Sequence, residues 1–275
     1  MREFGGIRFV YVPPGEFRMG SSDAEVQRAI ELCRSYPDDG GGDCATKFED
    51  ERPTRPVYLD AFWIMQTEIT NAQFASFVNS SGYLEQRYWS EEGWNWRKGE
   101  GITQPGYWSD ARLNEPQQPA VGLSWFEAEA FTNWFGQQSG LPARLPTEEE
   151  WEKAARDADG RFFPWGNDWN GSNANFCDRS CNLYAWADPN VNDGYAFTAP
   201  VGMYPAGASS YGALDMAGNV WEWVANRARR GGSWTNDPEG LRTTERLYDD
   251  RYTRTNTLEF PSKAGTGFRL VISDY

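Results

Sequence analysis

Two carboxylates stand close together in the segment YGALDMAGNVWEWV, with a glycine between them. Asp215 and Glu222 bracket a turn in which Gly218 can bring backbone carbonyls inward, and the carbonyls of Gly218 and Val220 can share one side of an extended loop. Such oxygens suit a hard cation such as calcium, which takes about six to eight oxygen ligands. Alternatively, Asp215 caps a turn and Glu222 is a solvated or ion-paired strand residue. Spacing alone favours this alternative.

Composition excludes several classes of function. The net charge of −14 and the pI near 4.6 argue against nucleic acid or an anionic membrane as a partner, because phosphate binding needs a basic surface. The chain has no histidine, which excludes a Ser-His-Asp triad and histidine-ligated iron, copper or zinc. Aromatic residues make up 16% of the chain, including 14 Trp, which suits either an irregular, loop-rich fold or a binding face.

The four cysteines form two local pairs in the sequence, Cys33 with Cys44 and Cys177 with Cys181. Two disulfides are favoured over a four-thiolate metal site, because neither pair has the two-residue gap usual in zinc sites. Oxidised pairs would favour an extracytoplasmic setting, although no apolar signal segment follows Met1. No apolar stretch is long enough to span a bilayer, so direct membrane insertion is not expected.

Local sequence signals predict short helices between strands. The stretch Ile7 to Met19 alternates around Pro13-Pro14-Gly15 and predicts a β-hairpin, and Val57 to Thr67 predicts a buried strand. Four capping boxes predict helix starts, because a hydroxyl and a carboxylate or amide three residues later satisfy each other's backbone amides. Glycines predict where the second and third of these helices end. The boxes are Ser22 with Glu25, Thr70 with Gln73, Ser124 with Glu127 and Thr147 with Glu150; the glycines are Gly82 and Gly140.

The region from Tyr83 to Gln118 is rich in tryptophan and tyrosine among glycines, prolines and charges. It shows no helical or strand periodicity, so it is interpreted as a long insertion. An aromatic-rich loop of this kind serves either as a packed lid or as a platform for a ligand, and both interpretations stay open.

The order of motifs along the chain resembles that of the formylglycine-generating enzyme, or sulfatase-modifying factor, family. The matching blocks are VYVPPGEFRMGS, VYLDAFWIMQTEITNAQF, PAVGLSWFEAEAFTNW, LPARLPTEEEWEKAAR, FPWGND, TAPVG, GALDMAGNVWEWV, RRGGSW and GFRLV. The resemblance implies one domain over residues 1–275. It also implies an α+β, C-type-lectin-like fold, in which a twisted antiparallel sheet is flanked by short helices and much irregular loop.

The resemblance also implies one or two bound calcium ions. Similar family members bind a first calcium through an asparagine and the following carbonyl, then through an aspartate and a carbonyl two residues on. Here these positions correspond to Asn175, Phe176, Asp193 and Tyr195. The second family site corresponds to Asp215, Gly218, Val220 and Glu222. The segment CDRSCNLYAWADPNVN departs from the family in length and puts the first site in more doubt than the second.

The catalytic residues of the family are missing. Its enzymes bind copper through two cysteines after the GGS motif, and these positions correspond to Asn236 and Leu241. Neither side chain can ligate Cu(I) or exchange with a thiol. Related iron-dependent sulfoxide synthases use three histidines, which this chain lacks. We therefore expect no copper, no haem and no nucleotide.

The expected function is binding without catalysis. Non-catalytic proteins with a similar fold include hypervariable receptors, whose variable residues lie between GGSW and GFR. The segment between GGSW and GFR in this chain is therefore expected to bind a protein or a carbohydrate, or to contact a larger complex. Arg242 and Arg246 are interpreted instead as members of structural ion pairs. The alternatives are an oxidoreductase with altered chemistry and a structural subunit of an assembly. The expected ligand face contains Trp234, Asn236, Asp237, Arg246, Tyr248, Asp249 and Tyr252.

Overall fold

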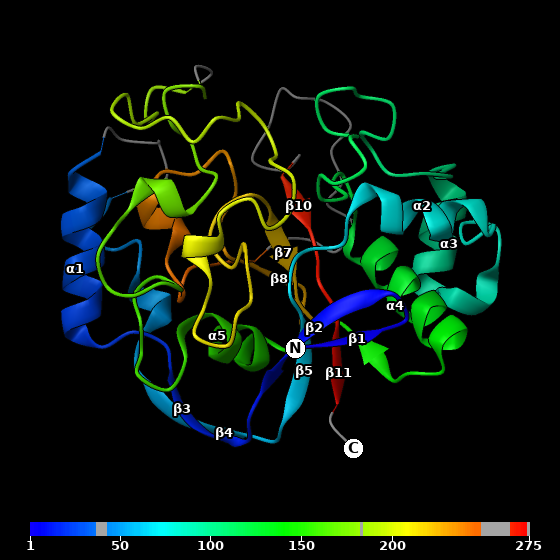
Figure 1. Ribbon diagram of the computed structural model, residues 1–275, viewed down its shortest axis with the longest axis horizontal. Helices are drawn as coiled ribbons and strands as arrows, with labels where there is room; N and C mark the ends of the chain where they lie inside the picture. Colours follow the sequence, from blue (N-terminus) through cyan, green and yellow to red (C-terminus); the bar gives the residue numbers. More distant parts are fainter. Residues whose placement is uncertain (37–42, 182–183, 249–264, 274–275) are drawn as a thin grey trace.

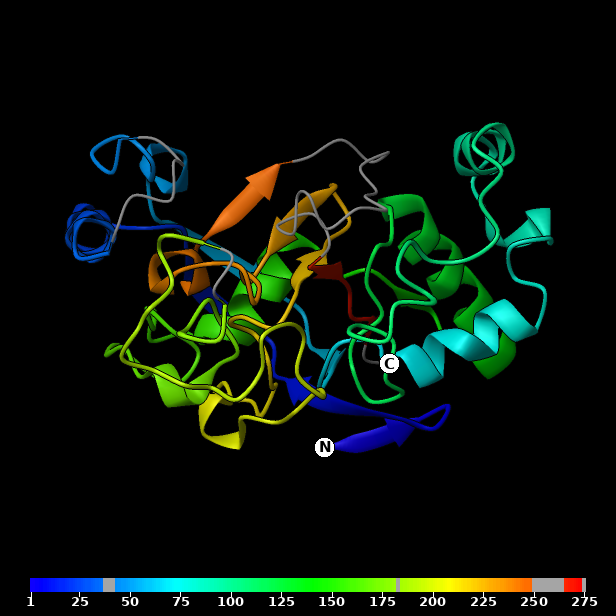
Figure 2. The ribbon, with the colours of Figure 1, turned by 90° about the horizontal axis from the view of Figure 1, so that it is seen from above.

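The computed structural model describes residues 1–36, 43–181, 184–248 and 265–273 (Figure 1). Helices α2, α3 and α4 gather on one side of the molecule and α1 lies on the other, with the strands between them (Figures 1 and 2). The α-helices of these ranges are α1 (Asp23–Arg34), α2 (Asn71–Asn79), α3 (Glu91–Gly99), α4 (Trp125–Ser139) and α5 (Glu148–Arg156). The short 3-10 helices are η1 (Glu49–Glu51), η2 (Gln86–Tyr88), η3 (Gly171–Asn173), η4 (Pro205–Gly207) and η5 (Pro238–Leu241).

All four predicted capping boxes are confirmed, at the starts of α1, α2, α4 and α5. Gly140 caps the C-terminal end of α4 with a φ of 71°, a left-handed conformation that glycine adopts without strain. Helix α2 ends earlier than its glycine, because Ser80 occupies the cap and Gly82 follows beyond it. Local hydrogen bonding therefore decides where these helices begin.

The larger sheet contains strands from both ends of the chain. Its order is β1-β2-β5-β11-β6, and every neighbouring pair is antiparallel. Strand β11 lies between β5 and β6, so the last described strand is an internal strand of the sheet. The strands are β1 (Arg2–Phe4), β2 (Ile7–Val12), β5 (Phe62–Met65), β6 (Ala143–Arg144) and β11 (Val271–Ser273).

The predicted hairpin over Ile7 to Met19 is wrong. Its second half, β3 (Gly15–Met19), pairs with β4 (Arg55–Leu59), while β2 pairs with β5. The predicted strand Val57 to Thr67 is likewise divided between β4 and β5, and one register continues from one ladder into the other. Because Pro13 and Pro14 have no amide hydrogen, the ladder is interrupted there and the chain passes from one sheet into the next.

A second sheet carries the C-terminal motifs. Its order is β10-β7-β8-β9, and β10 pairs with β7 in parallel. Among the named strands of the described ranges, the expectation of antiparallel pairing therefore holds for every other pair. The strands are β7 (Trp221–Trp223), β8 (Ala228–Arg230), β9 (Arg246–Tyr248) and β10 (Thr266–Gly267).

The aromatic-rich region from Tyr83 to Gln118 contains helix α3. The sequence predicts no helix here, because the segment shows no helical periodicity. Ser90 caps this helix by accepting a hydrogen bond from the Gly93 amide at 3.4 Å. Tyr83, Tyr88, Trp89 and Tyr107 are buried. Their burial favours the interpretation as packed structure over that as a ligand platform.

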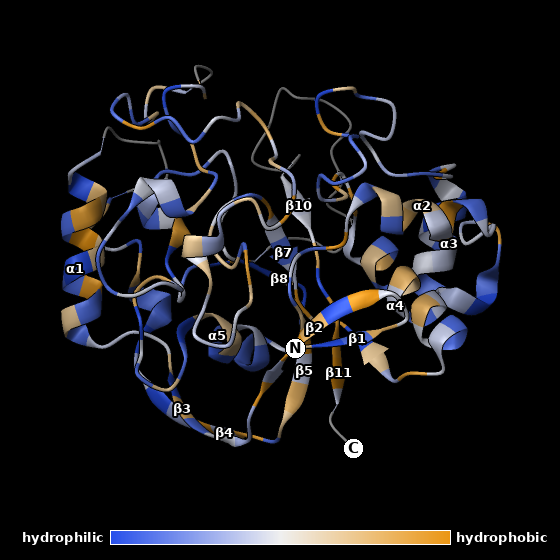
Figure 3. Cartoon of the chain, in the orientation of Figure 1, coloured by the Kyte–Doolittle hydropathy of each residue, from blue (hydrophilic) through white to orange (hydrophobic). Residues whose placement is uncertain are grey.

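Hydropathy follows the packing of the helices and strands (Figure 3). Helix α1 shows hydrophobic and hydrophilic bands, and its Val26, Ala29 and Ile30 are buried. The largest core cluster joins α2 to α4, where the rings of Phe74 and Phe131 stack with centroids 5.3 Å apart. Stacked and edge-on aromatic pairs thus stabilise the half of the molecule that contains α2, α3 and α4.

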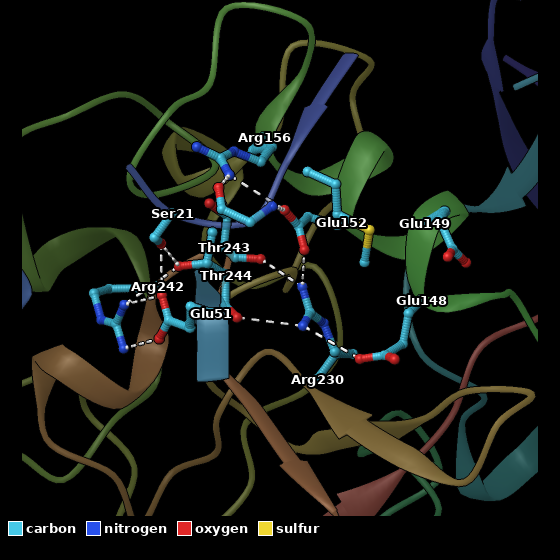
Figure 4. A network of polar contacts seen from close by, with 12 residues as sticks. Ser21, Glu51, Glu148, Glu149, Glu152, Arg156, Arg230, Arg242, Thr243 and Thr244 are labelled. Atoms are coloured by element: carbon cyan, nitrogen blue, oxygen red, sulfur yellow. Dashed lines mark hydrogen bonds and ion pairs between the residues drawn. The ribbon is translucent and has the colours of Figure 1, made fainter. Parts of the chain in front are cut away.

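A buried charge network joins distant parts of the chain (Figure 4). Glu152 of α5 is fully buried and accepts hydrogen bonds from Arg230 at 2.6 Å, Arg156 at 3.2 Å and the Gly20 amide at 2.7 Å. These donors lie on β8, on α5 and directly after β3. The network therefore fixes the N-terminal strands against the C-terminal sheet, and each buried charge in it has a partner.

Both predicted disulfides are present, Cys33–Cys44 and Cys177–Cys181, and no cysteine is left unpaired. The second bridge is buried, with exposures of 0% and 1% for its two residues. In the described ranges, no helix combines the length and the apolar character needed to cross a bilayer.

Candidate functional site

The first predicted calcium ligands lie in two loops that contact each other. Asp193 accepts hydrogen bonds from the Phe176 amide at 3.0 Å and from the Tyr195 amide at 2.8 Å. Asn175 is 1% exposed, and its amide nitrogen donates to the Phe197 carbonyl at 2.8 Å. Its Oδ1 atom is buried and has no hydrogen-bond partner among the described residues. An orphaned buried oxygen of this kind fits a cation ligand.

The charge of Asp193 is poorly compensated. Burial raises the pKa of this carboxyl to about 7, against the lowering effect of the Tyr195 and Phe176 amides, and the nearby Asp178 raises it further. A carboxylate destabilised by burial and by a like charge is a group that a bound cation would stabilise. The sequence interpretation missed Asp178, although its place between Cys177 and Cys181 marked a constrained loop.

The second predicted set surrounds a buried ion pair. Arg269 donates from Nε to Glu222 Oε2 at 2.7 Å and from Nη2 to Glu222 Oε1 at 2.6 Å. The indole of Trp151 also donates to Oε2, at 2.9 Å. Any cation bound by Glu222 would therefore share Oε1 with a guanidinium. The ion-paired alternative for Glu222 is present in the structure, and calcium at this set stays a prediction.

Asp215 lies beside a buried acid that the sequence interpretation missed. Glu68 is 0% exposed, and its Oε2 atom has no hydrogen-bond partner in the described part of the chain. Burial and the neighbouring Asp215 raise the pKa of Glu68 well above its usual range, and burial also raises the pKa of Asp215. Arg269 thus faces three buried carboxylates, those of Glu68, Asp215 and Glu222. No signal in the sequence near Glu68 pointed to this cluster.

Asn219 connects the two sets. Its Oδ1 accepts a hydrogen bond from Asn175 at 3.1 Å, and its Nδ2 donates to Glu68 at 3.1 Å. Its amide donates to the Asn175 carbonyl at 2.8 Å. The side chain is 1% exposed and the residue has a φ of 59°, which asparagine tolerates better than most residues. One left-handed asparagine therefore positions both oxygen-rich regions.

The expected ligand face is partly buried. Trp234 and Asp237 are only 1% and 4% exposed, so their placement on an exposed face is wrong: Trp234 packs edge-on to Phe197, and Asp237 caps η5. Arg246 is half-buried, whereas Tyr248 is 59% exposed on β9. The remaining predicted members, Asp249 and Tyr252, lie outside the described residues.

Asn236 and Leu241, the positions that the resemblance assigns to the catalytic cysteines, both have structural contacts. Asn236 Oδ1 accepts hydrogen bonds from the Ser233 amide and the Ser233 hydroxyl, both at 3.0 Å. Leu241 is 0% exposed and belongs to a hydrophobic core cluster. One position therefore closes a turn and the other fills a core.

The structural ion pair predicted for Arg242 is confirmed. Arg242 donates to both carboxylate oxygens of Glu51, at 2.8 and 2.9 Å, with Ser21 as a further donor to Glu51 at 2.6 Å. The interaction joins the segment before β4 to the segment after η5 (Figure 4). Arg242 therefore lies in the interior, whereas Tyr248 is exposed.

Within the described ranges, no three acidic or cysteine side chains lie close enough together to hold a metal ion. A cation at the first predicted set would depend on one carboxylate, one side-chain amide oxygen and two carbonyls, and a cation at the second set on two carboxylates and two carbonyls. Calcium accepts such mixed oxygen sets, whereas zinc and copper prefer nitrogen and sulfur.

Short capped helices, small and mostly antiparallel sheets, and long irregular loops define an α+β domain of the C-type-lectin-like class. The chain belongs to the sulfatase-modifying factor family, because the family described as "Sulfatase-modifying factor enzyme 1-like domain" matches residues 5–273. The structure and this match agree with the resemblance inferred from the motifs.

Curated relatives include both active and inactive proteins. A hercynine oxygenase of Mycobacterium tuberculosis is 34% identical over 245 residues, covering 75% of this chain and 53% of the relative. The chain thus spans about half the length of that relative. A formylglycine-generating enzyme of Thermomonospora curvata is 32% identical over 314 residues, covering 94% and 91%. An "Inactive C-alpha-formylglycine-generating enzyme 2" of Bos taurus is 28% identical, covering 95% and 89%.

Solved structures share the fold over the whole chain. PvdO from Pseudomonas aeruginosa has a TM-score of 0.66 at 22% identity and covers 100% of both chains. Treponema denticola variable protein 1 has a TM-score of 0.62 at 17% identity, covering 99% of this chain and 98% of that protein. At these identities the likeness concerns the fold alone.

Proposed function

We propose that this chain is a non-catalytic, calcium-stabilised binding or accessory domain of the sulfatase-modifying factor family. The observation that carries the proposal is the use of Asn236 in a turn and of Leu241 in a core, at the positions where family enzymes hold copper through cysteines. All four cysteines of the chain are bonded in disulfides, and the chain has no histidine. Soft Cu(I) therefore has neither thiolate nor imidazole to bind.

Calcium is proposed mainly for the first set of residues. Asn175 Oδ1 and Asp193 would bind it through side chains, and Phe176 and Tyr195 through carbonyls. The orphaned Asn175 oxygen and the poorly compensated Asp193 charge support this assignment. When bound, the ion would supply charge compensation and a cross-link between two loops, with no chemical step. The set of Asp215, Gly218, Val220 and Glu222 is proposed as a second site.

Removal of calcium is expected to lower the melting temperature. A ligand that binds only the folded state stabilises it by about 2.7 kcal/mol when its concentration is 100 times Kd. The test compares melting curves of the purified chain in millimolar calcium and in excess chelator, with magnesium as the matched control and elemental analysis for metal content. A melt that is the same in calcium and in chelator would contradict the proposal.

The ligand face is proposed around β9, because its Leu247 and Tyr248 are 39% and 59% exposed. Strand β9 lies on the side of the molecule opposite β1 and β2 (Figure 2). Exposed tyrosine presents a large, rigid contact surface to a protein or a carbohydrate.

Tyr248→Ala is expected to weaken binding of a protein or glycan found by array screening, by about 1–2 kcal/mol if the ring is a hot spot. Tyr11→Ala on β2 serves as the matched control and is expected to leave binding unchanged. Equal affinity of the Tyr248 variant and the wild-type protein for every such ligand would remove β9 from the proposed face. The melting temperature reports separately on the fold.

An oxidoreductase is the second candidate, and the similarity to hercynine oxygenase and formylglycine-generating enzyme favours it. Oxygen consumption with added copper or iron and a cysteine-containing peptide discriminates the two functions. Turnover would replace the binding proposal with an enzymatic one. A structural subunit, the third candidate, would co-purify with a stoichiometric assembly.

A further inference from the structure

Asp178 is a fully buried carboxylate that no predicted ligand set contains. Its Oδ1 atom accepts hydrogen bonds from the Ser180 amide at 2.7 Å and from the Ser180 hydroxyl at 2.6 Å. Its Oδ2 atom accepts a hydrogen bond from the Asp193 amide. All of these donors are neutral, so hydrogen bonds orient the carboxylate without cancelling its charge.

Asp178 and Asp193 form a close pair of acids. The Asp193 backbone amide donates to Asp178 Oδ2, so the two acids lie next to each other. Asp193 likewise receives its hydrogen bonds from neutral groups, the amides of Phe176 and Tyr195. A second observation points to a ligand: the neighbouring Asn175 is 1% exposed and leaves Oδ1 without a partner among the described residues.

The Cys177–Cys181 disulfide holds this loop in place. The Cys177 amide donates to the Asn236 carbonyl at 2.8 Å, and the Cys181 amide donates to the Asp178 carbonyl at 3.0 Å. Both sulfur-bearing residues are buried. The bridge therefore ties Asp178 to the turn that contains Asn236 and leaves the carboxylate little freedom to move away from Asp193.

We propose that Asp178 is a positioning residue of the first calcium site, which orients Asp193 and adds a second negative charge that matches the site to a divalent cation. The inference rests on the calcium site proposed above. Affinity of calcium sites depends on the number of acidic groups and on the rigidity of the loop, and Asp178 contributes to both. Groups that orient a ligand typically change metal affinity by about 10- to 100-fold when they are replaced.

The test is calorimetric titration of the metal-free full chain with calcium chloride. Asp178→Asn is expected to lower calcium affinity by about 10- to 100-fold. Its melting temperature in chelator reports separately on the fold, because one of the two backbone amides that donate to Asp178 would face the amino group of the new asparagine. Asp168→Asn is the matched control, since Asp168 is an exposed carboxylate paired with Arg28, and its calcium affinity is expected to stay unchanged.

The outcomes separate this inference from the one on which it rests. A wild-type chain that binds no calcium overturns the proposed site and this inference together. A wild-type chain that binds calcium, with an Asp178→Asn variant of equal affinity, overturns this inference alone. A variant that melts lower in chelator and keeps wild-type affinity assigns Asp178 a purely structural role.

Ser180→Ala decides the question if Asp178→Asn does not fold. This change removes the hydroxyl that lies 2.6 Å from Asp178 Oδ1 and 2.8 Å from the Tyr195 carbonyl oxygen, and it retains both carboxylates. A loss of calcium affinity of about fivefold, equivalent to one hydrogen bond, is expected. Unchanged affinity in this variant would overturn the positioning role.

Discussion

Arg269→Met is expected to lower the free energy of unfolding by about 3–5 kcal/mol. The guanidinium is fully buried and bonded to both oxygens of Glu222, at 2.6 and 2.7 Å. It also faces the buried Glu68 and Asp215. Without it, three acids would remain in the interior with their positive partner removed, so the cost arises from uncompensated charge more than from a lost contact.

Urea denaturation in chelator measures this effect. Arg112→Met is the matched control, because Arg112 pairs with Asp110 at the surface and its side chain is 49% exposed. Exposed pairs contribute about 0–1 kcal/mol, so the control should change stability little.

If Asp215 and Glu222 also bind calcium, the ion should stabilise the Arg269 variant more than the wild-type protein, because it replaces the missing charge. A loss below about 1 kcal/mol for Arg269→Met would contradict the account of a tightly held ion pair.

Glu51→Gln is expected to lower stability at neutral pH by about 3 kcal/mol and to reduce the sensitivity of the protein to acid. Burial alone would raise the pKa of Glu51, but the charge and hydrogen bonds of Arg242 and a hydrogen bond from Ser21 lower it from 4.5 to about 2. A carboxyl whose pKa is depressed in the folded state contributes stability above its unfolded pKa. That contribution is lost as the pH falls through 4.5 towards 2.

The difference in unfolding free energy between the wild-type protein and the Glu51 variant should therefore shrink across this pH range. Denaturation curves at several pH values measure it. Glu49→Gln is the matched control, because Glu49 is half-exposed and pairs with the surface Arg52 at 3.3 Å. A difference that stays constant between pH 6 and pH 2 would assign the stabilisation to packing instead of charge.

Helix starts were predictable because their chemistry is local. In α1, Ser22 and Glu25 satisfy each other's backbone amides over three residues, so the sequence contains the whole signal. Helix α3 was not predicted, because the signal for it is not local. Its capping serine lies in a segment with no apolar periodicity, and burial of Trp89 depends on a core cluster that includes residues of α2 and α4.

Strand partners and exposure depended on the tertiary structure. The alternation around Pro13 and Pro14 looks the same whether the two strands pair with each other or with a third segment. Trp234 stands in a motif that resembles an exposed face, yet packing against Phe197 buries it. Residue type and spacing do not report which surface a neighbouring loop covers.

The sequence by itself determined the family, four of the capped helices and both disulfides, because these depend on residue identity and short spacing. Only the tertiary structure decided how charge is distributed inside. Glu222 forms an ion pair with Arg269, which lies 47 positions away in the sequence. Asp178 accepts a hydrogen bond from the amide of Asp193, which lies 15 positions away. Electrostatic interactions act through space, so the partners of a buried carboxylate are known only when the chain is folded.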